Sequence, residues 1–130
     1  MTVTIVAGPP CSGKTHHVLT YAAAEDLVID WDDIAIELGS PRLHLHPKPM
    51  LAAIAAEYDR RLELITTWPA DVWIVRGLPD PLERNEWVTR YGAQLVLCSA
   101  PLDMLHRRAL DRENPRLTAW SIDRWHERAQ

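Results

Sequence analysis

Several features that mark other classes of protein are missing from this sequence. No apolar run approaches the roughly 20 residues that a membrane-spanning helix requires, so we exclude such a helix. The formal net charge is -4, which excludes the overall positive field of a non-specific nucleic-acid binder. Only two cysteines occur, Cys11 and Cys98, far apart in the chain, and the start carries no secretory signal pattern, so we expect a cytoplasmic location.

The overall composition is that of an ordinary folded protein. Hydrophobic residues make up 47% and charged residues 25%, well outside the range of disordered chains. At 130 residues the chain has room for one compact domain, 1–130, and not for two. We therefore look for a single active site.

Apolar runs and helical patterns alternate along the whole chain. Short apolar runs predict strands at 2–7, 27–29, 72–75 and 95–98. Helical spacing predicts helices at 14–24, 34–38, 50–67, 82–91, 101–110 and 121–128, with proline-containing loops at 40–49 and 111–117. This alternation predicts an α/β fold with a short, mainly parallel sheet of four to five strands and helices on both faces. The residues at the strand ends, Gly8, Asp30, Arg76 and Ser99, should then face one crevice.

The segment after the first predicted strand matches the phosphate-loop pattern G-x-x-x-x-G-K-[ST] without a mismatch. Its backbone N–H groups and the start of the next helix would form a nest for the phosphates of a nucleoside triphosphate. Lys14 would reach the β- and γ-phosphates, and the Thr15 hydroxyl would bind Mg²⁺. The residues expected to bind ATP are Gly8, Pro9, Pro10, Cys11, Ser12, Gly13, Lys14, Thr15 and His16, with Arg112 from a later segment.

An acidic stretch, Asp30-Trp31-Asp32-Asp33, follows the second predicted strand. The third strand is followed by Arg76 where many phosphate-loop proteins have an aspartate, so Asp30 is the expected partner of Thr15 in holding Mg²⁺. We expect Asp32 to accept the proton of an attacking hydroxyl, held by backbone N–H groups at the start of the short helix. Asp33 is expected to contact the substrate or to cap that helix. Helix capping within a solvated turn is the alternative for all three carboxylates.

Arginines supply the positive charge that phosphate chemistry needs. Arg76 lies at the crevice, where it would bind substrate; an ion pair with one of the three aspartates is the alternative. Arg108 and Arg112 lie four residues apart on one helical face. We expect them to cover the nucleotide from a lid at about 107–117 and to stabilise the transferring phosphate. Alternatively, they belong to a solvated basic helix end paired with Asp103, Asp111 and Glu113.

Two histidines, His44 and His46, lie in the first proline-containing loop. Two ligands at this spacing make a weak metal site, so we expect a loop that faces the substrate or is simply exposed. The segment from His44 to Lys48 would be the acceptor site if the protein were a small-molecule kinase.

Together these motifs resemble the phosphate-loop kinases of the polynucleotide kinase type, which include small phage and actinobacterial proteins. The resemblance covers nearly the whole chain. GPPCSGKT is similar to the family's phosphate loop, and DWDDIA to the segment whose first paired aspartate, here Asp32, is the catalytic base. LPDPLERNEWVTRYGAQLVL is similar to a strand–helix–strand unit of the family, and PLDMLHRRALDR to its lid, with Arg108 and Arg112 at the arginine positions. Two positions differ, because Ile34-Ala35-Ile36 lacks the family's arginine and Arg76 replaces a small polar residue.

The resemblance implies a three-layer P-loop NTPase fold. It also implies an ATP- and Mg²⁺-dependent kinase that phosphorylates a hydroxyl of a nucleic acid, a nucleotide or a nucleoside. Two alternatives remain open: a kinase of another small molecule, and a nucleotide-dependent ATPase or switch that acts through a partner. No membrane is expected among the partners.

Overall fold

Four parallel strands form the centre of the computed structural model, which describes all 130 residues. They are β1 (Val3–Ala7), β2 (Leu27–Ile29), β3 (Val72–Val75) and β4 (Gln94–Leu97), in the order β2-β3-β1-β4. All three pairings are parallel, and Ile5 lies opposite Ile74 on one side and Leu95 on the other. The predicted α/β class and parallel sheet are confirmed, and every strand lies within one residue of its predicted limits.

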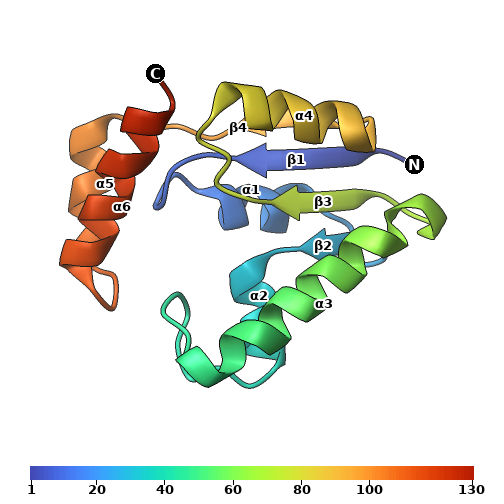
Figure 1. Ribbon diagram of the computed structural model, residues 1–130, viewed down its shortest axis with the longest axis horizontal. Coiled ribbons are helices and arrows are strands. Elements are labelled where there is room, and N and C mark those ends of the chain that lie inside the picture. Colours follow the sequence, from blue (N-terminus) through green and yellow to red (C-terminus); the bar gives the residue numbers. More distant parts are fainter.

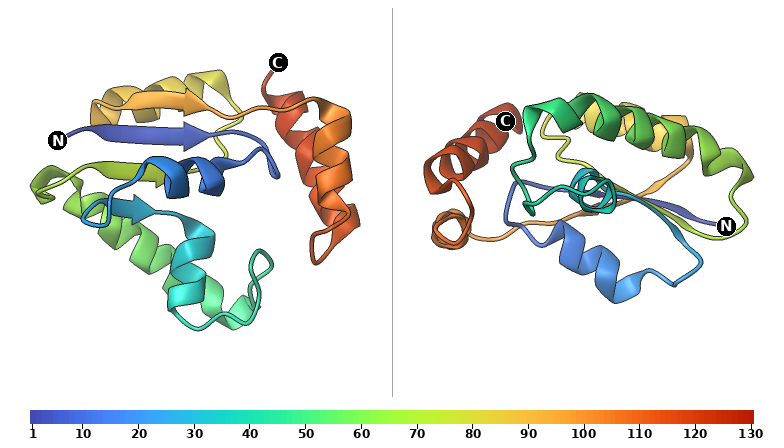
Figure 2. Two further views of the ribbon diagram at one scale, coloured as in Figure 1. Left: turned by 180° about the vertical axis from the view of Figure 1, so that it is seen from behind. Right: turned by 90° about the horizontal axis from the view of Figure 1, so that it is seen from below.

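Helices cover both faces of this sheet, as the two views in Figure 2 show. Helix α1 (Lys14–Tyr21) packs on one face, where Val18 meets Val6 and Val75. Helices α3 (Leu51–Leu64) and α4 (Pro81–Tyr91) lie on the other face, and α2 (Trp31–Glu37) packs against α3. Side chains alternate along each strand, so Val3, Ile5 and Ala7 belong to the α3 side of the core and Val6 to the α1 side.

The last two helices, α5 (Leu102–Ala109) and α6 (Pro115–Arg128), pack on each other beyond the carboxyl ends of the strands (Figure 1). Their contact buries Leu105, Ala109 and Ile122, and Cys11 from the loop after β1 joins the same cluster. This helical pair therefore docks directly on the 8–15 loop. None of the helices has the length and apolar character needed to cross a bilayer.

Helix caps explain where the predicted helix limits were wrong. Helix α2 begins at Trp31 rather than Ile34 because the Asp30 side chain accepts a hydrogen bond from the Asp32 N–H and caps it. Helix α6 begins at Pro115, inside the predicted loop, because the Asn114 side chain accepts from Leu117 N at 3.1 Å.

Two other helices are shorter than the sequence predicted. Helix α1 ends at Tyr21 because the Asp26 carboxylate binds the Ala23 N–H in a turn, at 2.8 Å. The predicted 50–67 helix is α3 flanked by single 3₁₀ turns, Lys48–Met50 and Ile65–Thr67. These differences leave the strand ends, and so the edge of the sheet that carries the site, unchanged.

Candidate functional site

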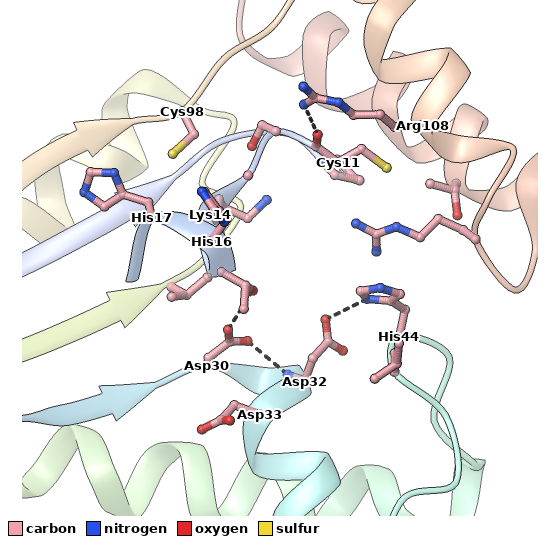
Figure 3. Close-up of a pocket in the computed structure, with 18 of the residues that line it drawn as sticks. Cys11, Lys14, His16, His17, Asp30, Asp32, Asp33, His44, Cys98 and Arg108 are labelled. Atoms are coloured by element: carbon pink, nitrogen blue, oxygen red, sulfur yellow. Dashed lines mark hydrogen bonds and ion pairs between the residues drawn. The ribbon is translucent and has the colours of Figure 1, made fainter. Parts of the chain in front are cut away.

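A cavity of about 1160 Å³ opens at the carboxyl ends of the strands, and most of the predicted site residues line it. Figure 3 shows it between the start of α1, the start of α2, the loop that carries His44, and the α5–α6 pair. The predicted residues on its wall are Pro10, Cys11, Ser12, Gly13, Lys14, Thr15, His16, Asp30, Asp32, Asp33, Arg76, Arg108 and Arg112. Ser99 also lines it, whereas Gly8 and Pro9 do not. They are buried where the loop leaves β1.

The 8–15 loop curves through residues with positive φ angles. Glycine adopts such angles easily, whereas other residues adopt them only at a cost in free energy. Gly8 has a φ of 152°, and a Cβ there would lie 2.5 Å from the carbonyl oxygen of Cys98. Gly13 (φ 93°) occupies the position before α1, and Cys11 has a φ of 67° although it has a side chain. The strain at Cys11 is held by packing, since its side chain is buried with Leu105.

One buried polar atom in the 8–15 loop lacks a partner. The Oγ of Ser12 is buried and makes no hydrogen bond, which is rare for a hydroxyl inside a protein. Helix α1, which starts beside it, has no side-chain cap and no acidic residue in its first turn. Its N-terminal N–H groups therefore stay available for an anion. An orphaned hydroxyl beside an uncapped helix start fits a phosphate group.

The Lys14 ammonium folds back on the loop and donates to the carbonyl oxygens of Gly8 and Pro9, both at 2.8 Å. Burial lowers the pKa of Lys14 to about 8, against the opposing charges of Cys98 and Asp30, and the nearby Arg112 guanidinium lowers it further. The Lys14 ammonium and the Arg112 guanidinium near it favour the binding of an anion, which would raise the pKa of Lys14 again.

Thr15 and Asp30, the predicted Mg²⁺ ligands, are in direct contact. The Thr15 hydroxyl donates to Oδ2 of Asp30 at 3.0 Å, and Asp30 is only 5% exposed. Burial raises the pKa of Asp30, and the Thr15 hydrogen bond lowers it in part. Hydroxyl and carboxylate oxygens are the ligands that Mg²⁺ prefers. No group of three acidic, histidine or cysteine side chains gathers as a cation site, so an ion here would complete its shell with phosphate or water oxygens.

The prediction that backbone N–H groups hold Asp32 was wrong, because Asp30 occupies the capping position. The Asp32 carboxylate instead points to the 40–47 loop, where it meets His46 Nε2 at 2.7 Å and His44 Nδ1 at 3.2 Å. Asp33 does not cap the helix either, although it lines the cavity. Burial raises the pKa of Asp33, and the nearby charges of Glu37 and Asp30 add to the effect.

Arg76 forms no ion pair with the aspartates, so that alternative was wrong. Its guanidinium lies 4.6 Å from the ring centroid of Trp87 and 5.6 Å from that of Tyr58. The Tyr58 hydroxyl donates to the carbonyl of Val75, and burial raises the pKa of Tyr58 to about 12. Two aromatic rings therefore hold a cation at the cavity wall without neutralising its charge.

The arginines of the predicted lid, at 107–117, make different contacts. Arg108 Nη1 donates to the carbonyl of Cys11 at 2.8 Å and so ties α5 to the 8–15 loop. Arg112 lines the cavity near Lys14. Arg107 faces away and pairs with Asp103 within α5, at 3.5 Å. Neither Arg108 nor Arg112 pairs with Asp103, Asp111 or Glu113, so the pairing expected in the solvated alternative was wrong for both.

Glu113 ties the lid to the loop that carries His44, a contact that no sequence pattern predicted. Its Oε1 accepts hydrogen bonds from the backbone N–H groups of Leu43 (3.0 Å) and His44 (3.1 Å). Although burial opposes the effect, hydrogen bonds from the backbone N–H groups of Glu113 itself, His44 and Leu43 hold the pKa of Glu113 below its usual value. This bridge joins two loops that lie 70 residues apart in sequence, next to the part of the cavity wall that Leu43 and His44 form. Neither the bridge nor the Asp32–histidine contacts leave a local sequence signal.

A scan against models of protein families and a search among curated proteins found no match to this chain. A proposal for the function of this protein therefore rests on the chemistry of the cavity itself.

Proposed function

We propose that this chain has the P-loop NTPase fold and is an ATP- and Mg²⁺-dependent kinase. The acceptor of the phosphate is a hydroxyl of a nucleic acid, a nucleotide or a nucleoside. The observation that carries the proposal is the 8–15 loop, which joins β1 to α1, matches the phosphate-loop pattern and buries an unpartnered Ser12 hydroxyl. The strand order β2-β3-β1-β4, with this loop at the carboxyl end of a central strand, supports the same fold.

The residues around the loop divide the work of phosphate transfer. Backbone N–H groups and the Ser12 hydroxyl would bind the phosphate oxygens, and Lys14 would neutralise their charge as it leaves the carbonyls of Gly8 and Pro9. Arg112 is the better placed of the two lid arginines to stabilise the transferring group, because Arg108 already holds Cys11. Thr15 and Asp30 would hold Mg²⁺, which neutralises phosphate charge when bound.

The acceptor half of the cavity lies on the side of Asp32. Asp32 is the carboxylate that would remove the hydroxyl proton, directly or through a neighbour, and Arg76 and Asp33 would orient the acceptor. Leu43, Leu45 and Leu117 also line the cavity, and such apolar side chains favour a second candidate, a kinase of a small molecule with an apolar part.

Two measurements test the proposal. Calorimetry should detect binding of ATP in the presence of Mg²⁺, and γ-labelled ATP should pass its label to one member of a panel. The panel contains a 5′-hydroxyl oligonucleotide, nucleosides, nucleotides and uncharged alcohols. Asp32→Asn should abolish transfer and leave the Kd for ATP within about threefold, since it removes the carboxylate on which proton removal depends and not the phosphate nest. Tight ATP binding without transfer to any acceptor would favour a nucleotide-dependent switch instead.

A further inference from the structure

Both oxygens of the Asp32 carboxylate are occupied by imidazole groups. Oδ1 meets His46 Nε2 at 2.7 Å, and Oδ2 meets His44 Nδ1 at 3.2 Å. An ionised carboxylate only accepts hydrogen bonds, so each of these ring nitrogens must carry the proton that it donates. This requirement selects one tautomer for each neutral ring.

His46 has no free nitrogen to offer a substrate. Its side chain is 1% exposed, and its Nδ1 lies 2.7 Å from the Ser40 hydroxyl while its Nε2 is used by Asp32. The His46 ring therefore holds the Asp32 carboxylate in its orientation, as buried hydrogen-bonding partners do for functional side chains.

His44 is different, because only one of its ring nitrogens is used. Its Nδ1 donates to Asp32, its Nε2 makes no hydrogen bond, and its side chain is 33% exposed on the cavity wall. In the tautomer that Asp32 selects, Nε2 holds a lone pair and no proton. Figure 3 shows the ring of His44 reaching from its loop into the cavity above Asp32. The backbone of His44 is held in place by Glu113.

We propose that Nε2 of His44 is the atom that takes the acceptor's proton, and that Asp32 orients the ring and stabilises the imidazolium that forms. The assignment rests on the proposed kinase function. As the acceptor oxygen bonds to the γ-phosphorus, the bond from that phosphorus to the β–γ bridging oxygen breaks, and ADP leaves with the electron pair. The hydroxyl proton moves to Nε2 and passes to water after the product leaves. His44 is thus a catalytic residue, and Asp32 acts on the substrate through it.

The test compares the rates of γ-phosphate transfer by the wild type, His44→Ala and His44→Gln. The probe is γ-labelled ATP with Mg²⁺ and the best acceptor of the panel, with water always present as an acceptor. His44→Ala should lower kcat about 100- to 1000-fold and leave the Kd for ATP within about threefold. Added imidazole should raise the transfer rate of His44→Ala at least about tenfold, because it fills the space left by the side chain and supplies the missing base.

Two variants keep the result interpretable. His44→Gln can still donate a hydrogen bond to Asp32 but cannot take a proton, so it should be as slow as His44→Ala and should not respond to imidazole. His106→Ala removes a second His–Asp pair, Nε2 to Asp123 at 2.8 Å, on the outside of α5 and α6, and should leave the rate unchanged.

Three results would overturn the assignment. Transfer by His44→Ala within about threefold of the wild type, with none by Asp32→Asn, would make Asp32 itself the base. Recovery of the rate by His44→Gln, without rescue of His44→Ala by imidazole, would reduce His44 to a positioning role. If the wild type binds ATP but transfers phosphate to no acceptor, water included, the proposed function itself fails and the assignment falls with it.

Discussion

The lowered pKa of Lys14 leads to a specific prediction about stability and pH. Without a ligand, burial lowers the pKa of this side chain from 10.5 to about 8. The folded protein therefore binds fewer protons than the unfolded chain between these two pH values, so its stability should rise with pH across that window. Below pH 8 the folded protein bears the full free-energy cost of burying the charged Lys14 side chain. Above pH 10.5 Lys14 is neutral in both states, so this cost is absent.

The magnitude follows from the same values. At about 1.4 kcal/mol for each pKa unit, the fall from 10.5 to about 8 corresponds to at most about 3.5 kcal/mol. The Lys14 side chain keeps some contact with water, which screens its charge, so we expect a rise of about 1 to 3 kcal/mol.

Urea unfolding followed by the fluorescence of the six tryptophans measures this change at pH 7.5, 9 and 10.5. The free energy of unfolding of the wild type, relative to Lys14→Met, should rise over this range. The comparison removes the contributions of ionisable groups that do not interact with Lys14. Lys48→Met is the matched control, because Lys48 is exposed and is the only other lysine.

Bound ATP should weaken this pH dependence, since phosphate near Lys14 favours its charged form. The stabilisation by ATP should therefore decrease from pH 8 to 10.5. Parallel curves for the wild type and Lys14→Met without ligand would refute the argument that burial controls this lysine.

Three further variants test other parts of the site. Gly8→Ala should destabilise the fold by about 1 to 3 kcal/mol and weaken ATP binding at least about tenfold, because the added Cβ would meet the Cys98 carbonyl. Urea unfolding measures the first effect and calorimetry the second, and normal ATP binding would contradict the loop geometry. Glu113→Ala should change the free energy of unfolding by less than about 1 kcal/mol but raise the rate of amide hydrogen exchange at Leu43 and His44 at least about tenfold. Unchanged exchange rates would show that the bridge does not form in solution. Arg76→Ala should raise KM for an anionic acceptor at least about tenfold without changing KM for ATP, since no carboxylate pairs with the Arg76 guanidinium. An equal effect on both substrates would argue against an acceptor site beside Arg76.

Local patterns were enough to predict the framework of this protein. Short apolar runs predicted all four strands, because apolar side chains pack on the pleated surface of a sheet. The glycine spacing and Lys14 predicted where the 8–15 loop lies, since its curvature depends on backbone freedom at Gly8 and Gly13. Helix starts were harder, because a single capping side chain, Asp30 or Asn114, moves the start by several residues.

The partners of the functional side chains were decided only by the tertiary structure. Asp32 and His46 are 14 residues apart, and Glu113 and Leu43 are 70 apart, joined through a loop whose path no periodicity describes. Arg76 follows β3 and lies against Tyr58 of α3 and Trp87 of α4, so packing brings these three side chains together although they are not close in sequence. Sequence alone therefore determined which chemical groups this protein has at the edge of its sheet, because strand and loop signals are local. The folded chain determined which of those groups touch, because side-chain contacts depend on how distant segments pack.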